Sequence, residues 1–101
     1  MNATIYIAKS GVAKTLQVLQ ASGKRQHEGI VFWLGRRSGE RIDVVDVYEP
    51  AHEAEADYFH IPRDSMQLLQ DELRSKRLMI AAQVHSHPGR AFFFLARGDK
   101  P

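Results

Sequence analysis

Two histidines one residue apart, His85 and His87, follow an apolar run over residues 78–84. Side chains two residues apart on an extended chain share a face, so a strand ending here presents both imidazoles together. Neutral imidazole is a good zinc ligand, and a catalytic zinc usually takes three protein ligands and keeps one position open for water. The pair therefore predicts part of a metal site, and the polar end of a buried strand is the alternative interpretation.

A hydrolytic metal site also needs a carboxylate that takes a proton from water and passes it to the leaving group. Glu28 is the candidate, because it precedes the apolar run GIVFWLG at residues 29–35. A packed strand would fix its backbone while its carboxylate faces a cleft. The alternative is a solvated glutamate at a strand edge. His52 and His60 are interpreted as loop or half-buried residues.

Length and composition restrict the kind of site. The chain has 101 residues, which suits a single domain over residues 1–101. It contains no cysteine, so a metal here would be held by histidine, carboxylate and water. The absence of cysteine also suits a cytoplasmic protein.

Charge and hydropathy argue against two classes of partner. The formal charge is +2 and the basic residues are scattered, so the sequence does not favour nucleic acid. Its apolar stretches are far shorter than the roughly 20 residues that span a bilayer, and no signal pattern opens the sequence. We therefore expect no membrane association.

The elements that would position the candidate residues alternate along the chain. Ser10 is a candidate N-cap for a helix at about residues 11–21, whose apolar face would be Val12, Leu16 and Leu19. Residues 4–8 and 29–35 have strand patterns. The second of these strands should pair as a hairpin with residues 42–45 through Ser38 and Gly39.

A second helix is predicted at about residues 65–74, because Met66, Leu69 and Leu73 recur at helical spacing. Asp64 and Gln67 would form its capping box. A buried strand at residues 78–85 follows. Together these patterns predict an α/β or α+β domain with a mixed, largely antiparallel sheet flanked by two helices. Phe92 to Phe94 are interpreted as core or as a hydrophobic rim.

The combination of HEGIVFWLGR near the start and QVHSHPG after a helix and a strand resembles the JAMM/MPN (JAB domain) zinc metalloproteases. Their signature is a glutamate in E-x2-G-x-L-x-G, followed by H-[ST]-H-P-x6-S-x2-D. The resemblance covers most of the chain and implies a JAB/MPN-like, cytidine-deaminase-like fold. It implies that Glu28 is the general base and that His85 and His87 hold zinc. The implied reaction hydrolyses an amide or isopeptide bond, in many relatives at the C-terminus of a ubiquitin-like protein.

In the early element, Val31 replaces the first glycine of the signature and Trp33 its leucine, although Gly35 stands seven residues after Glu28 as the signature asks. The sequence departs from the signature again after Pro88. Leu95 stands where the serine belongs and Gly98 where the aspartate belongs, and both were expected on a loop. Asp99 lies one residue late, so it becomes the third metal ligand if that loop absorbs one residue. The missing serine removes an oxyanion donor, whose loss typically costs a factor of about 10² to 10³. Weak activity is the expectation.

Relatives continue past the signature with another helix and strands, whereas this sequence stops at Pro101. We therefore expect a core that lacks the C-terminal part of the fold, with an open sheet edge through which two copies could dimerise. Three functions stay open. They are a JAMM-type zinc peptidase acting on a protein or peptide, an inactive JAB-type binding module, and a small basic nucleic-acid-binding domain.

Overall fold

The computed structural model describes residues 3–24, 28–51, 53–54, 59–86 and 93–96. Within these ranges the helices are α1 (Lys9–Lys24) and α2 (Arg63–Lys76). The strands are β1 (Thr4–Tyr6), β2 (Gly29–Ser38), β3 (Arg41–Tyr48), β4 (Glu53–Ala54), β5 (Phe59–His60), β6 (Met79–Ser86) and β7 (Phe93–Ala96).

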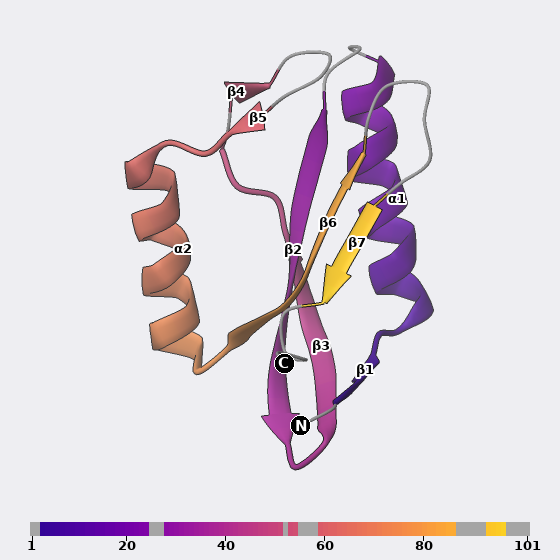
Figure 1. Cartoon of the computed structure of the whole chain (residues 1–101), viewed down its shortest axis with the longest axis vertical. Coiled ribbons are helices and arrows are strands. Elements are labelled where there is room, and N and C mark those ends of the chain that lie inside the picture. Colours follow the sequence, from indigo (N-terminus) through magenta and orange to yellow (C-terminus); the bar gives the residue numbers. More distant parts are fainter. Residues whose placement is uncertain (1–2, 25–27, 52, 55–58, 87–92, 97–101) are drawn as a thin grey trace.

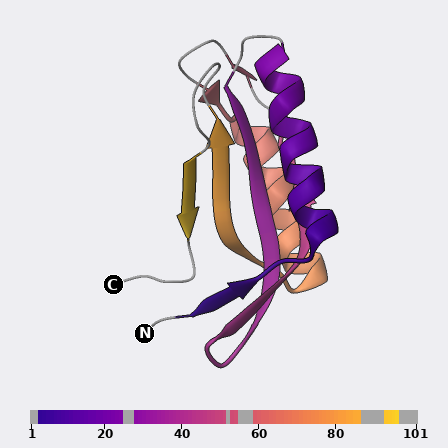
Figure 2. The ribbon, with the colours of Figure 1, turned by 90° about the vertical axis from the view of Figure 1, so that its right-hand side faces the viewer.

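The described strands form a five-stranded sheet in the order β1-β3-β2-β6-β7, beside a small β4-β5 pair. β1 is parallel to β3, and every other neighbouring pair in the large sheet is antiparallel. Figure 1 shows α1 and α2 on opposite sides of the sheet, and Figure 2 shows β7 beside β6 at its margin. The predicted α+β class with a mixed, largely antiparallel sheet is confirmed.

The predicted hairpin joins β2 and β3 through a two-residue turn. Ser38 pairs with Arg41, which leaves Gly39 and Glu40 in the turn. Gly39 has a φ of +61°. A glycine with positive φ at the first central position is typical of a type II′ turn, whose twist matches that of the flanking strands.

β2 extends past Gly35, the residue at which the sequence pattern ended it. A Cβ at Gly35 would lie 2.6 Å from the carbonyl oxygen of Asp43. The register with β3 also shifts between Leu34 and Gly35. This glycine therefore lets two backbones approach closely at a bulge, instead of marking the end of a strand.

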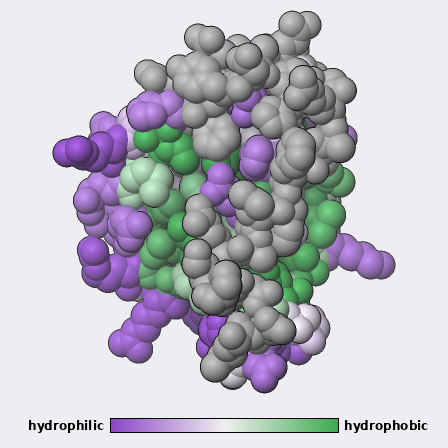
Figure 3. Space-filling view, in the orientation of Figure 1, coloured by the Kyte–Doolittle hydropathy of each residue, from purple (hydrophilic) through white to green (hydrophobic). Residues whose placement is uncertain are grey.

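An apolar cluster lies between α2 and the sheet. Ile30, Phe32 and Leu34 of β2 pack with Leu69 of α2 in one buried cluster. Met66 and Leu73 pack against the same cluster, which confirms the predicted inner face of α2. The outer side of this helix is hydrophilic (Figure 3).

The predicted capping box of α2 is wrong. The N-cap residue is Pro62 and makes no side-chain capping hydrogen bond. Gln67 instead donates from Nε2 to Asp71 Oδ1 at 3.0 Å, one turn further along the helix. Asp64 still lies in the first turn, and Arg74 and Lys76 lie in the last, so charges of the favourable sign stand at both ends of the helix dipole.

The predicted inner face of α1 is only partly right. Leu19 is buried, but Val12 and Leu16 are 40% and 37% exposed. The helix turns Thr15 and Ser22 inward instead, and it begins at Lys9, so Ser10 lies within it and not at its N-cap. Trp33 gives the reason, because its Nε1 donates to Thr15 Oγ1 at 3.0 Å. A buried indole N–H needs such an acceptor.

No helix in the described ranges is long and apolar enough to cross a membrane.

Candidate functional site

Glu28 directly precedes β2 and is 3% exposed. Its place at the start of a packed strand agrees with the sequence-based prediction. Its burial does not agree with the alternative, a solvated glutamate at a strand edge. Glutamate is rarely buried so deeply, because removing a carboxylate from water is costly unless the surroundings compensate.

His85 lies near the carboxyl end of β6, directly opposite Ile30 of β2. Residues opposite each other in an antiparallel pair share a face of the sheet. Ile30 packs in the α2 cluster, so half-buried His85 lies on the α2 face. Strand alternation continued two residues back from Ile30 places Glu28 on that face too. Two of the predicted site residues therefore lie at the same end of neighbouring strands.

The other predicted metal ligands, His87 and Asp99, lie outside the described residues. Among the residues that are described, no group of three histidine, cysteine, aspartate or glutamate side chains could hold a metal. The described part thus contributes one imidazole and one buried carboxylate to the candidate site. One imidazole is fewer than the three protein ligands that a catalytic zinc usually takes.

The opposite face at this end of the sheet is packed closely against α1. Gly29 pairs with Ser86, the residue after His85. A Cβ at Gly29 would lie 2.9 Å from Leu19 Cδ2 and from both Cβ and Oγ of Ser22. The helix therefore rests on the backbone between Glu28 and Ile30, and this contact helps to fix the backbone position of Glu28 directly before β2.

Sequence reasoning missed this contact, because Gly29 was interpreted as a strand boundary and Ser22 was not considered. Both serines are buried, with Ser22 1% and Ser86 3% exposed. Neither hydroxyl has a hydrogen-bond partner among the described residues. A glycine directly after the candidate base, together with a serine late in the preceding helix, is the signal that could have indicated close packing.

The structure also corrects the expectation for Leu95, which belongs to strand β7 near the site. Leu95, the residue at the family's serine position, was expected on a loop. It lies instead in β7, opposite Gln83 of β6, and Phe93 of the same strand lies opposite His85. Phe94 also belongs to this strand, opposite Val84. Apolar residues at consecutive positions suit a strand that pairs with a buried neighbour.

The interpretation of His52 and His60 as loop or half-buried residues is wrong for His60 and untested for His52. His60 is exposed on β5, paired with Glu53 of β4. His52 lies outside the described residues. The exposed position of His60 makes it a useful control for variants at His85.

Comparison with known proteins finds a similar curated sequence and similar solved structures. No family model matches it. It is 26% identical over 93 residues to the probable metalloprotease y4jG of Sinorhizobium fredii, a match that covers 88% of this chain and 57% of that protein. The solution structure of protein DSY2949 from Desulfitobacterium hafniense superposes with a TM-score of 0.70 at 20% identity, covering 84% of this chain and 57% of the other.

The chain thus spans about 57% of the length of each of these two proteins. The structural match concerns the fold alone, because its identity is low. Taken with the buried Glu28 beside the strand of His85, the sequence match establishes a distant relationship to a protein named as a probable metalloprotease.

Proposed function

We propose that the protein is a zinc-dependent peptidase or isopeptidase of the JAMM type, with weak activity. The arrangement of Glu28 and His85 carries the proposal. A buried carboxylate at the start of β2 and an imidazole at the end of β6 share one face and one end of the sheet. The resemblance to the JAMM signature and the 26% identity to a probable metalloprotease support the same chemistry.

His85, His87 and Asp99 are the residues that would hold the metal. The chemistry that zinc supplies when bound is Lewis acidity toward water and a carbonyl oxygen. Two of these three residues lie outside the described ranges, so their roles rest on the sequence pattern.

Glu28 would act as the general base. Its carboxylate accepts a proton from water as the water oxygen attacks the amide carbon, and then delivers that proton to the departing nitrogen as the C–N bond breaks. The tight packing of Gly29 against α1 holds the adjacent backbone in place, which favours a fixed position for the base.

Activity should be weak because one part of the signature is missing. The family's serine position is Leu95, and an alkyl side chain cannot donate a hydrogen bond to an oxyanion. Loss of one such donor costs a factor of about 10² to 10³ in turnover. A ubiquitin-like protein linked through an isopeptide bond is the substrate class that the resemblance favours.

The test compares the protein with Glu28→Gln in hydrolysis of an isopeptide-linked ubiquitin-like substrate. The variant keeps the shape of the side chain but removes the base. We expect slow, zinc-dependent cleavage by the protein and none by the variant, with zinc content equal in both. Cleavage that persists in Glu28→Gln would exclude Glu28 as the base.

One observation favours a second function, a non-catalytic binding module of the same fold. Leu95 lies in a paired strand, and Gly98 stands where the signature has its aspartate. The double variant Leu95→Ser, Gly98→Asp separates the two functions. We expect tighter zinc binding and faster cleavage, abolished by adding Glu28→Gln. Zinc binding without cleavage across a panel of ubiquitin-like substrates would instead favour the binding module.

A further inference from the structure

The edge of the sheet that is remote from β6 is only partly covered. β1 pairs with Arg41, Ile42 and Asp43 of β3 and then ends at Tyr6. Val44, Asp46 and Val47 of β3 pair with β2 on their inner side, and Val45 is the extra residue of the bulge. None of the described strands pairs with the outer side of residues 44–47. Backbone groups on that side therefore form an open edge, which the bulge interrupts at Val45.

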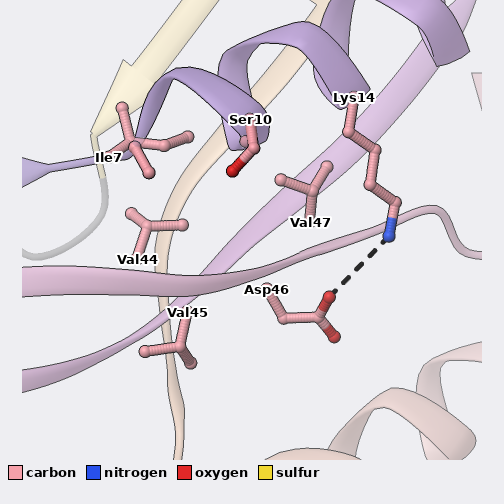
Figure 4. Close-up of a pocket in the computed structure, with 9 residues that line it drawn as sticks. Ile7, Ser10, Lys14, Val44, Val45, Asp46 and Val47 are labelled. Atoms are coloured by element: carbon pink, nitrogen blue, oxygen red, sulfur yellow. Dashed lines mark ion pairs between the residues drawn. The ribbon is translucent and has the colours of Figure 1, made fainter.

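A groove runs beside this open edge, between β3 and the first turns of α1. It is a pocket of about 300 Å³, small for a drug-sized ligand but suited to individual side chains. In Figure 4, Val44 and Val47 point toward α1, whereas Val45 and Asp46 point away from it. The pocket is lined by Ile7, Ala8, Ser10, Gly11, Lys14, Val44, Val45, Asp46 and Val47.

One ion pair crosses the groove. Lys14 reaches from α1 toward Asp46, with Nζ 3.8 Å from Oδ1, and the two side chains are 54% and 37% exposed. Such exposed pairs stabilise a fold by about 0–1 kcal/mol, so Lys14 can exchange this carboxylate for another at little cost. A lysine over an open edge also discourages unwanted strand pairing. The pair therefore lies where it would control access to β3.

We propose that this edge binds an extended, acidic peptide segment of a partner protein, which adds to β3 as a further strand. The backbone of the peptide would pair with residues 44–47, and a β-branched side chain would enter the pocket beside Val44 and Val47. An acidic side chain of the peptide would replace Asp46 as the ion-pair partner of Lys14. Charge complementarity supports the acidic character, because Lys14 lines the groove, Lys9 stands between the lining residues Ala8 and Ser10 in the sequence, and the first turn of α1 carries no acidic residue.

The short length of the open edge favours a peptide over a second copy of this chain. The stretch of β3 that β1 leaves unpaired covers only residues 44–48. In a two-fold pair, the partner's own β1 and α1 would be brought against the same stretch. A single extended segment meets no such obstacle. The proposal does not depend on a metal, because β2 separates this edge from β6.

The first test uses three labelled heptapeptides that alternate valine with threonine around a central aspartate. One is unmodified, and the other two are N-methylated at the two alternate sets of backbone amides. Fluorescence polarisation should show binding of the unmodified peptide and of one methylated form only, because a strand uses one edge to pair with β3. Equal binding of both methylated forms, or no binding of the unmodified peptide, would overturn the proposal.

The second test exchanges charges. Lys14→Glu should weaken binding of the aspartate peptide by roughly three- to tenfold, and a peptide with lysine in place of aspartate should recover it. Arg74→Glu on α2, where Arg74 pairs with Asp71 of the same helix, is the matched control and should leave binding unchanged. Amide chemical shifts should respond to the peptide at residues 44–47. Responses confined to β6, or dimerisation that accounts for the polarisation change, would contradict peptide addition at this edge.

Discussion

The two faces of the sheet are built from different kinds of side chain. On the α2 face, Ile30, Phe32, Leu34 and Leu69 form a buried apolar cluster, and the buried polar residues of this side, Glu28 and Ser65, are not members of that cluster. On the α1 face, Leu19 and Val31 share the interior with the buried polar residues Thr15 and Ser22. The apolar face gains stability mainly from area removed from water. The mixed face adds directional contacts that fix the position of the helix on the strands.

The largest expected effect is on the apolar face. Leu69 is fully buried between α2 and β2. Leu69→Ala should lower the free energy of unfolding by about 2–5 kcal/mol, because it removes buried methyl groups and leaves a cavity. Urea unfolding followed by circular dichroism measures this loss. Leu68→Ala is the matched control, since Leu68 is 63% exposed, and a loss similar to that of Leu69→Ala would contradict the described core.

Gly29→Ala tests the contact between α1 and the backbone beside Glu28. The added Cβ would lie 2.9 Å from Leu19 and Ser22, so we expect a loss of about 1–3 kcal/mol in unfolding free energy from overpacking. Adding Ser22→Gly should recover part of the loss, although a glycine inside a helix itself costs about 1 kcal/mol. Strictly additive effects on the unfolding free energy in this double-mutant cycle would show that the two residues do not interact.

Thr15→Val tests the hydrogen bond that draws α1 inward. The substitution keeps the shape of the side chain and removes the acceptor for Trp33 Nε1. We expect a loss of about 1–2 kcal/mol in unfolding free energy and a change in tryptophan fluorescence. Thr15→Ser keeps the hydroxyl and should preserve the fluorescence, and an identical spectrum for the valine variant would argue against this bond.

The smallest expected effect concerns an exposed pair at the end of β3. Arg41 donates to the Asp43 carboxylate at 3.0 Å, and this hydrogen bond lowers the pKa of Asp43 below its ordinary value. A lowered carboxyl pKa stabilises the fold above the unfolded-state pKa of about 4 and ceases to do so as the pH falls through the folded-state value. Arg41→Gln should therefore differ slightly from the original protein at neutral pH.

That difference should shrink as the pH falls below about 4, where Asp43 is protonated in the unfolded chain. Thermal unfolding across this range measures it. A difference in stability between the two proteins that grows in acid would contradict the expected direction.

The apolar elements were predictable from the sequence. Strand β2, helix α2 and the β2–β3 hairpin follow from runs and spacings of apolar residues, which local patterns report directly. The inward face of α1 was not predictable in this way. Thr15 is buried because it accepts a hydrogen bond from Trp33, 18 positions later, and a window of neighbouring residues does not contain that information.

The residues of the candidate site fall into the same two groups: some follow from local sequence patterns, and others depend on contacts between distant parts of the chain. Glu28 and His85 were identified by residue type and by their places at strand ends, and the pairing of β2 with β6 brings those ends together. The roles of Gly29 and Ser22 could not be predicted, since they depend on the docking of α1. The strand position of Leu95 was also missed, because a run of phenylalanines fits a rim as well as a paired strand.

The account depends most directly on metal binding at the end of β6. The decisive measurement is the zinc content of the purified protein, compared with that of His85→Ala and of the exposed control His60→Ala. We predict one zinc ion per chain in the protein and in His60→Ala, and loss of zinc in His85→Ala. Zinc retained at the same stoichiometry in His85→Ala would contradict the account.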